Sequence, residues 1–190
     1  MKNILKIGSI ITIAILLFIL ILALGSYFSP KGGRIILNKE IHAPFLDEVT
    51  QKDELLLFFG YVGCTDVCSP FLNQMHNLLD HKELEEKRKK IDLVFINLLF
   101  DMPMEEAKAF AHIFDKNFIG INVDKAVLSK LQQDFKLYFS TSLFDKSVIN
   151  HTDYLYALKR GSKKGSWIIK AFYFTKPLNE KALTEQLLGQ

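Results

Sequence analysis

The sequence predicts an α/β fold in which a mixed sheet carries helices on its faces. Two continuous apolar runs, at residues 54–63 and 91–100, are typical of strands buried on both sides. Apolar residues at helical spacing follow these runs. Near the C-terminus, two alternating segments flank a turn with a glycine at each end, which is typical of a β-hairpin. Strands that alternate with helices and end in a hairpin predict a mixed sheet.

Each element has its own signal in the sequence. Apolar residues at helical spacing define the first helix, which we expect to run from residue 66 or 67 to Lys87. Pro103 marks the start of the next helix, while Asp124 and Asn179 are placed to cap the two later ones. The predicted elements are an extended opening segment at 34–45, strands at 54–63, 91–100, 118–123, 154–159 and 166–174, and helices at 66–87, 104–114, 124–135 and 179–189.

The N-terminal segment predicts a membrane anchor ahead of this domain. The run from Ile7 to Phe28 carries no charge and would be about 33 Å long as a helix, enough to cross a bilayer. Lys2 and Lys6 precede the run and favour a cytoplasmic N-terminus. The alternative is a cleaved signal peptide, although the apolar region of a signal peptide is normally shorter.

These features predict the division of the chain and its location. We expect a cytoplasmic stretch at 1–6, a transmembrane helix at 7–28, a linker at 29–34 and one domain at 35–190. A single pass would hold the protein in the inner membrane, with the domain in the periplasm or extracytoplasmic space.

Charge argues against nucleic-acid binding. The formal net charge of the whole chain is +3, and two of its positive charges belong to the N-terminal lysines. The remaining part is therefore close to neutral and lacks the basic stripe that binds nucleic acid. With only two cysteines, a disulfide scaffold is also excluded.

The two cysteines, Cys64 and Cys68, are the strongest functional signal. They lie where the first buried strand passes into the first helix, and ligand sites in such sheets lie at the carboxyl ends of strands. Their spacing would allow both sulfurs to bind one ion or to bond each other. The N-terminus of the helix would stabilise thiolates. Asp66, between the cysteines, is interpreted first as a helix cap.

Three interpretations compete at this pair. A permanent disulfide would close a loop too short to stabilise the fold much. A redox couple usually has two residues between its cysteines. Thioredoxin-type enzymes also place a proline opposite them, whereas this chain has no proline between Met104 and Lys176. A metal site suits soft thiolates, which select Cu(I), zinc or iron–sulfur clusters, but Cu(II) or zinc needs a further ligand.

A histidine is the best candidate for that further ligand. His76 lies in the same predicted helix, about 10 Å or more along its axis, and is too far away. His81 and His112 lie on helices amid polar neighbours, and His42 stands in the irregular opening segment. His151 lies in a predicted loop just ahead of a strand that we expect beside the first buried strand. From that place its imidazole could reach across to the cysteines.

Longer stretches around these residues resemble the Sco/SenC family. The stretch LLLFFGYVGCTDVCSPFLNQM resembles the family's apolar strand, glycine turn and cysteine pair with an aspartate between them. VINHTDYLYAL resembles its second signature, a histidine ahead of a Tyr-Leu strand, while FDMPMEEAKAF and FIGIN resemble a helix start and a short strand. The resemblance covers most of residues 35–190. Thr65 replaces the family's usual proline, and Ser69 displaces the next one.

The resemblance implies a thioredoxin-like domain modified for copper. Family members bind one Cu(I) or Cu(II) through two cysteines and a distant histidine, roles that fall here on Cys64, Cys68 and His151. They help to assemble the dinuclear copper centre of cytochrome c oxidase, by delivering copper or by keeping the acceptor's cysteines reduced. We therefore expect a membrane-anchored copper chaperone whose partner is the cytochrome c oxidase copper-site subunit or another periplasmic copper protein.

Two alternatives to the chaperone stay open. The first is a thiol–disulfide reductase in which Cys64 and Cys68 react with the cysteines of a copper-site protein and no metal is needed. The second is a domain that uses the same fold only for contact with other proteins.

Overall fold

The computed structural model describes residues 12–21, 33–99, 101–141 and 149–189. The chain divides into two compact units, residues 1–31 and 32–190. In the first unit, residues 12–21 are helical and exposed. Within the described residues, no helix has the length and apolar character needed to cross a membrane. The rest of the predicted anchor, residues 7–11 and 22–28, lies outside the described residues.

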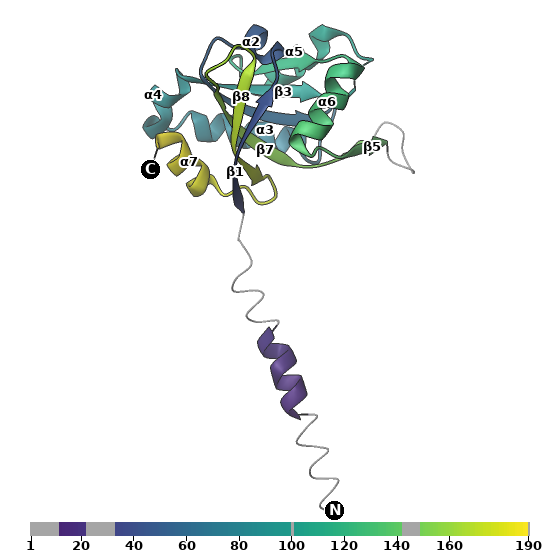
Figure 1. The fold of residues 1–190 in the computed structure, drawn as a ribbon, viewed down its shortest axis with the longest axis vertical. Coiled ribbons are helices and arrows are strands. Elements are labelled where there is room, and N and C mark those ends of the chain that lie inside the picture. The colour runs from purple at the N-terminus through teal and green to yellow at the C-terminus, as the bar shows by residue number, and fades with distance from the viewer. Residues whose placement is uncertain (1–11, 22–32, 100, 142–148, 190) are drawn as a thin grey trace, which may run out of the picture. The chain divides into compact units, whose positions relative to one another are not determined.

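The second unit is built around a six-stranded mixed sheet with the order β1-β8-β7-β2-β3-β4 (Figure 1). β2, β3 and β4 are parallel, while β7, β8 and β1 add antiparallel pairs. All five predicted strands are present. The strands of the sheet are β1 Arg34–His42, β2 Glu54–Gly60, β3 Ile91–Asn97, β4 Ile119–Asn122, β7 Tyr154–Arg160 and β8 Ser166–Phe174.

Helices cover both faces of the sheet, and each face has its own apolar core. One core joins the sheet to α3, α5 and α7, and the other joins it to α2 and α6. Phe58 and Phe95 are buried in the first core, Phe59 and Trp167 in the second, so the apolar runs that hold the three phenylalanines are buried as predicted. The helices are α2 Phe45–Val49, α3 Cys68–Leu79, α4 Glu85–Arg88, α5 Met104–Phe114, α6 Lys125–Phe135 and α7 Glu180–Leu188, with a 3₁₀ turn η1 at Lys82–Leu84.

The predicted caps of the later helices are confirmed. The Asp124 side chain accepts a hydrogen bond from the Val127 amide, and the Asn179 side chain accepts one from the Ala182 amide. Each bond satisfies an amide that a helix N-terminus leaves without a partner in the helix. Pro103 stands directly before α5, also as predicted.

The first helix is shorter than predicted. α3 ends at Leu79, and His81 has an extended backbone before the chain turns again in η1 and α4. This break carries Leu84 into the core, where it is fully buried. The apolar spacing that defines the helix stops at Leu79, and Leu84 does not continue it, so the prediction carried the helix too far into the charged stretch that follows.

The opening segment is extended as predicted, whereas the region before β7 differs from the prediction. β1 is a nine-residue strand that pairs with β8, with an irregularity between Ile36 and Lys39. Asn38 has a positive φ at this bulge. A second, two-stranded sheet joins β5 (Phe139–Thr141) to β6 (Ile149–His151). His151 therefore lies at the end of a strand, paired with Phe139, rather than in a loop.

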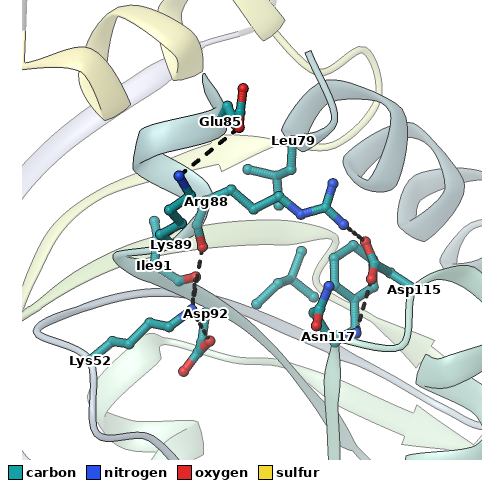
Figure 2. Close-up of a pocket in the computed structure, with 11 residues that line it drawn as sticks. Lys52, Leu79, Glu85, Arg88, Lys89, Ile91, Asp92, Asp115 and Asn117 are labelled. Carbon is teal, nitrogen blue, oxygen red and sulfur yellow. Dashed lines mark hydrogen bonds and ion pairs between the residues drawn. The ribbon is translucent and has the colours of Figure 1, made fainter. Parts of the chain in front are cut away.

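Charged side chains line a hollow at the edge where the parallel strands begin. This hollow is about 370 Å³ in volume, and Lys52, Arg88, Asp92 and Asp115 lie around it (Figure 2). It lies at the end of the sheet opposite to the cysteines, because Lys52 precedes β2 and Cys64 follows it.

Candidate metal centre

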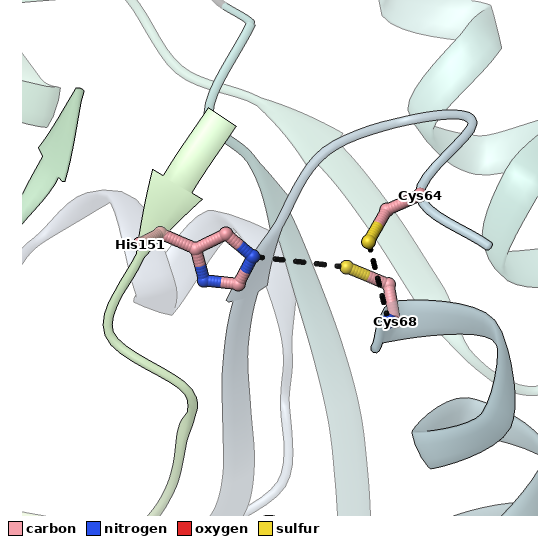
Figure 3. Close-up of side chains that lie close together, drawn as sticks. All are labelled: Cys64, Cys68 and His151. Carbon is pink, nitrogen blue, oxygen red and sulfur yellow. Dashed lines mark hydrogen bonds between the residues drawn. The ribbon is translucent and has the colours of Figure 1, made fainter. Parts of the chain in front are cut away.

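Three side chains from distant parts of the chain meet beyond the carboxyl end of β2. The sulfurs of Cys64 and Cys68 and a ring nitrogen of His151 all lie within 4.8 Å of one another. The Cys68 sulfur is 4.0 Å from Nε2 of His151, and Figure 3 shows the imidazole directed at the two sulfurs. Both cysteines are free thiols. The structure thus brings together the three residues that the sequence singled out.

The cysteines are held by a turn rather than by one helical face. Cys64 lies in the turn that follows β2, and Cys68 is the first residue of α3. The Cys68 amide, at the helix N-terminus, donates a hydrogen bond to the Cys64 sulfur at 3.4 Å. Asp66 is not the helix cap that was predicted: no side chain caps α3, and the Asp66 carboxylate accepts a bond from Thr65 instead.

Gly60 makes room for the Cys68 sulfur at the end of β2. A Cβ atom at this position would lie 2.6 Å from the Cys68 sulfur and 2.9 Å from a ring carbon of Phe95. Both distances are shorter than real contacts allow, and the crowded atoms belong to buried side chains. A glycine is therefore required for the buried thiol to lie against the strand.

Ser69 fixes the backbone of Cys64. Its amide and its hydroxyl both donate hydrogen bonds to the Cys64 carbonyl oxygen, at 3.2 and 2.8 Å. The Cys64 amide donates in turn to the Tyr61 carbonyl at 3.2 Å. A proline at position 69 would have neither of the two donors that Ser69 provides. The departure from the family pattern at this position therefore adds support for the cysteine turn.

A buried asparagine ties the same turn to the neighbouring strands. The Asn97 side chain accepts a hydrogen bond from the Val62 amide at 3.2 Å and donates one to the Asn122 side chain at 2.9 Å. The Leu98 amide also donates to the Gly60 carbonyl at 2.7 Å. The ends of β2, β3 and β4 are thus joined directly beneath the turn that carries Cys64.

His151 is oriented by contacts on the side away from the sulfurs. Its Nδ1 lies 3.1 Å from a carboxylate oxygen of Asp153 and 3.2 Å from the Thr152 carbonyl, and both are acceptors. A proton on Nδ1 leaves the Nε2 lone pair facing the cysteines, the tautomer that a metal ligand needs. The Tyr61 ring packs edge-on against the imidazole, with ring centroids 6.1 Å apart.

The surroundings give the two thiols different acidities. A hydrogen bond from the Cys68 thiol holds the pKa of Cys64 well below its ordinary value, and contacts to His151 and to the first amides of the helix add to this effect. The interaction with Cys64, together with burial, raises the pKa of the Cys68 thiol. The predicted stabilisation of a thiolate is therefore found at Cys64 but not at Cys68. A metal ion bound at Cys68 would have to displace the proton of its thiol.

The imidazole and the phenol respond to the Cys64 sulfur. Burial opposes a charge on His151, but Cys64, the Thr152 carbonyl and Asp153 outweigh it and raise the pKa of the imidazole. Burial, together with the neighbouring Cys64 sulfur, raises the pKa of Tyr61 to about 12. The metal-free site thus favours an imidazolium beside the Cys64 thiolate, with a protonated phenol at its edge.

The cluster opens into a shallow hollow of about 300 Å³. Cys64, His151, Asp153 and Lys176 are among its lining residues, whereas Cys68 is fully buried behind Cys64. An ion or a partner's ligand would therefore approach from the side of Cys64. His42, His76, His81 and His112, all in the described part of the chain, do not join the cluster.

The distances suit a small soft cation. Bonds from thiolate and imidazole to a first-row metal ion are about 2.0–2.3 Å, so three ligands in a trigonal arrangement lie about 3.5–4 Å apart. The three atoms here lie within 4.8 Å, and small side-chain rotations would close that difference. Two sulfurs and one nitrogen favour copper or zinc over magnesium or calcium.

Sequence reasoning missed the residues that support this site. Gly60, Asn97 and Asp153 touch the cysteine turn or the histidine, but none of them stands out by residue type or spacing. Asp153 offered the only local signal, a carboxylate two residues after the candidate histidine.

Comparison with known proteins finds relatives over most of the chain. The sequence model of the SCO1/SenC family matches residues 42–176. The SCO2-like protein RT0576 of Rickettsia typhi is 25% identical over 195 residues, covering 90% of this chain and 92% of the relative.

Solved structures are similar over the same region. The crystal structure of Arabidopsis thaliana ScoI with copper bound has a TM-score of 0.62 at 17% identity, covering 83% of this chain and 96% of the other. The solution structure of apo Sco1 from Thermus thermophilus has a TM-score of 0.59 at 19% identity, covering 85% and 92%. These likenesses show the thioredoxin-like α/β fold. Because the family model matches most of the sequence, this chain belongs to the SCO1/SenC family.

Proposed function

We propose that this protein binds copper through Cys64, Cys68 and His151 and supplies it to the copper site of cytochrome c oxidase. The observation that carries the proposal is the meeting of two sulfurs and one imidazole nitrogen within 4.8 Å. Membership of the family and the likeness to the copper-bound Arabidopsis thaliana protein support the choice of metal.

The ligand set suits both oxidation states of copper. Two thiolates satisfy Cu(I), which accepts soft ligands and low coordination numbers, and the imidazole completes a three-coordinate site for Cu(II). Binding displaces the protons of Cys68 and His151, so affinity rises with pH until both are lost. Release then depends on the oxidation state and on a partner that offers competing soft ligands.

We further propose that residues 7–28 anchor the protein in the inner membrane and that the domain lies outside the cytoplasm. The uncharged run and the two preceding lysines support this arrangement. The partner would be the copper-site subunit of cytochrome c oxidase or another copper protein of the same compartment. An anchored carrier would meet such a subunit at the membrane that holds both.

Replacing Cys64 or Cys68 by serine tests copper binding directly. Each change removes a thiolate from a site with only three ligands, so we expect stoichiometric copper to be lost in both oxidation states. The measurement is metal content after purification from copper-supplemented cells, with sulfur ligation checked by X-ray absorption.

The control for this test is His76→Ala. His76 bonds Asp115 at the far end of the sheet and should leave copper content unchanged. Copper retained with the same sulfur signal in both serine variants would contradict the proposal.

The structure also supports a thiol–disulfide reductase as a second candidate. The Cys64 thiolate would attack a disulfide of the partner and form a mixed disulfide, with one partner sulfur leaving as a thiolate. Cys68, after losing its proton, would attack Cys64, so that the partner becomes a dithiol and this protein carries a Cys64–Cys68 disulfide. The free, adjacent thiols and the lowered pKa of Cys64 favour this reaction.

Metal-free protein separates the two candidates. Rapid reduction of a partner disulfide by the copper-free form, abolished in Cys68→Ser, would favour the reductase. Tight 1:1 copper binding with slow disulfide turnover would favour the carrier. Failure of both assays would leave the fold as a module for protein contact alone.

A further inference from the structure

The beginning of β1 exposes apolar side chains on both of its faces. Ile35, Ile36 and Leu37 are 42%, 60% and 43% exposed. Successive residues of a strand point to opposite faces, so neither face of β1 is covered here. β1 is also the edge of the sheet, paired with β8 alone. Three adjacent exposed aliphatic residues on an edge strand indicate that another surface covers them.

Half-buried aromatic residues continue this surface along the neighbouring strands. In the register of the sheet, Phe172 lies opposite Ile35, and Phe174 lies opposite Tyr154. The Tyr154 ring stacks on Phe172 at 4.7 Å and meets Phe174 edge-on at 5.1 Å. We call these three aromatic residues together with Ile35, Ile36 and Leu37 the apolar rim.

The apolar rim lies at the same end of the sheet as the cysteines and the histidine. The register aligns Arg34 with Tyr173, Tyr173 with Leu155, and Leu155 with Phe58. Phe58 is two residues before Gly60, where the cysteine turn begins. Neighbouring strands lie about 4.8 Å apart, so three spacings place β1 about 14 Å from β2 across this end.

We propose that the apolar rim rests on the surface of the lipid bilayer. The inference rests on the membrane anchor of the proposed function. Six residue steps separate Phe28, the end of the predicted anchor, from Arg34, the start of β1, and they span at most about 22 Å. If the anchor spans the membrane, the start of β1 is limited to within about 22 Å of its end.

The chemistry of the apolar rim suits a headgroup layer better than a second protein copy. Aliphatic and aromatic side chains bind at the boundary between headgroups and acyl chains, where tyrosine is enriched. Arg34, exposed directly before these aliphatic residues, would face anionic lipid phosphates, whereas Lys39 is bonded to Asp134. The consequence is an orientation: the hollow beside Cys64 and His151 is held close to the membrane, where an acceptor anchored in the same bilayer presents its copper site.

Photo-crosslinking to lipid tests this orientation. The full chain would be reconstituted in vesicles of phosphatidylethanolamine and phosphatidylglycerol, with Ile36, Ile113 or Leu16 replaced, one at a time, by p-benzoylphenylalanine. Ile113 is 74% exposed and lies at the end of α5 that is remote from the cysteines, so it controls for exposure. Leu16 lies in the predicted anchor and reports whether the segment is in the bilayer. Adducts would be identified by mass spectrometry.

We expect strong lipid adducts at Leu16, and adducts at Ile36 several-fold above those at Ile113. If lipid adducts form at Leu16 but those at Ile36 do not exceed those at Ile113, the contact of the apolar rim with the bilayer is overturned and the membrane anchor is retained. Crosslinks from Ile36 to a second copy of the chain would overturn that contact in favour of a dimer. No lipid at Leu16 would overturn the anchor and the bilayer contact together. Copper content, measured on the same variants, reports separately on the proposed metal site and on folding.

Discussion

The two ends of the central sheet both gather ionisable side chains, but they neutralise them in different ways. At the far end, Arg88 pairs with the buried carboxylate of Asp115, which also accepts a hydrogen bond from the Asn117 amide (Figure 2). The His76 ring bonds the same carboxylate. At the other end, two thiols and an imidazole face one another with no arginine or lysine bonded to either sulfur among the described residues (Figure 3).

The far end shows what a cluster built for stability requires. Lys52 bonds the Asp92 carboxylate at 2.8 Å and the Ile91 carbonyl at 2.9 Å, so its charge and its donors are satisfied. Such partners offset the desolvation of a buried charge. Among the described residues, the side chains around this hollow do not form a group of ligand atoms that could hold a metal ion.

At the cysteine end, no arginine or lysine among the described residues pairs with a sulfur, and the Cys64 thiolate is balanced by the His151 imidazole, which is itself a candidate ligand. The three ligand atoms converge on one another, and the interactions that hold them act from the side away from the cluster. Asp153 bonds the far nitrogen of His151, and Ser69 bonds the backbone of Cys64. Both ends of the sheet hold ionisable residues, so their presence alone does not identify a metal site. The candidate metal centre is distinguished because its ligand atoms point at one another and neighbouring residues hold those ligands in place.

Of the variants that distinguish the cysteine end of the sheet from the far end, His151→Ala should have the largest effect, a loss of Cu(II) affinity. It removes the only nitrogen ligand, so Cu(II) affinity should fall by more than the roughly 100-fold that loss of a supporting group can cause. Cu(I) should stay bound by the two thiolates. Competition titrations with a chelator for each oxidation state measure both affinities. An unchanged Cu(II) affinity and visible charge-transfer band would remove His151 from the ligand set.

Asp115→Ala should give the complementary result. It leaves the Arg88 guanidinium without its buried partner, which should lower the free energy of unfolding by about 2–3 kcal/mol. A fully buried pair would lose about 3–5 kcal/mol, but the Arg88 side chain is still 24% exposed. Urea unfolding of the metal-free chain measures the loss. Copper affinity should be unchanged, and a parallel loss of copper would mean that the two ends are coupled.

The sequence was informative about the core and about the three candidate ligands. Long apolar runs such as 54–63 specify buried strands, and cap residues such as Asp124 mark helix starts, because these signals are local. The candidate ligands were found because cysteines are scarce and because His151 precedes a strand expected beside β2. The pairing of β7 with β2 confirms that expectation.

The remaining features depend on contacts between distant segments. β5 and β6 have three residues each, too short for a periodic pattern. β1 carries exposed aliphatic residues and a bulge at Asn38, so it does not alternate as a half-buried strand should. The need for glycine at position 60 arises only when Cys68 packs against it. No local rule reveals such requirements before the chain is folded.

Asp153→Asn should have a smaller effect than loss of the histidine. The amide still accepts a hydrogen bond from Nδ1 but removes the charge that raises the basicity of the imidazole. Cu(II) affinity at neutral pH should fall by about tenfold, the lower end of the range for a group that supports a metal ligand. Cu(I) affinity should change less. Matched titrations of Asp153→Asn and Asp66→Asn provide the control, because Asp66 is exposed and bonds only its neighbour Thr65 among the described contacts. Equal losses in the two variants would indicate a general charge effect.

The smallest effects concern pH, and here the two ends should act with opposite sign. Burial favours a neutral Asp115, but the Asn117 amide, His76 and Arg88 outweigh it and hold the pKa of this carboxyl below its ordinary value. A lowered pKa in the folded state gives stability that is complete above the unfolded value of about 3.9 and is lost as pH falls through the folded value. The raised pKa of His151 gives metal-free protein stability that is complete below about 6.5 and is lost as pH rises through the folded value.

Urea midpoints of the metal-free chain, measured from acid to alkaline pH, separate these contributions. Asp115→Asn should flatten the decline on the acid side only, because an amide does not titrate. His151→Asn should flatten the decline above neutrality, and it should also reduce the acid-side contribution of Cys64, whose lowered pKa depends in part on His151. Asp115 and His151 lie at opposite ends of the sheet and share no contact in the described residues, so the two effects should add in the double variant. If Asp115→Asn also changed the slope of the urea midpoint against pH on the alkaline side, protonation at one end of the sheet would affect the stability contributed by the other end. The far end and the cysteine end could then not be treated as separate, one for stability and one for binding.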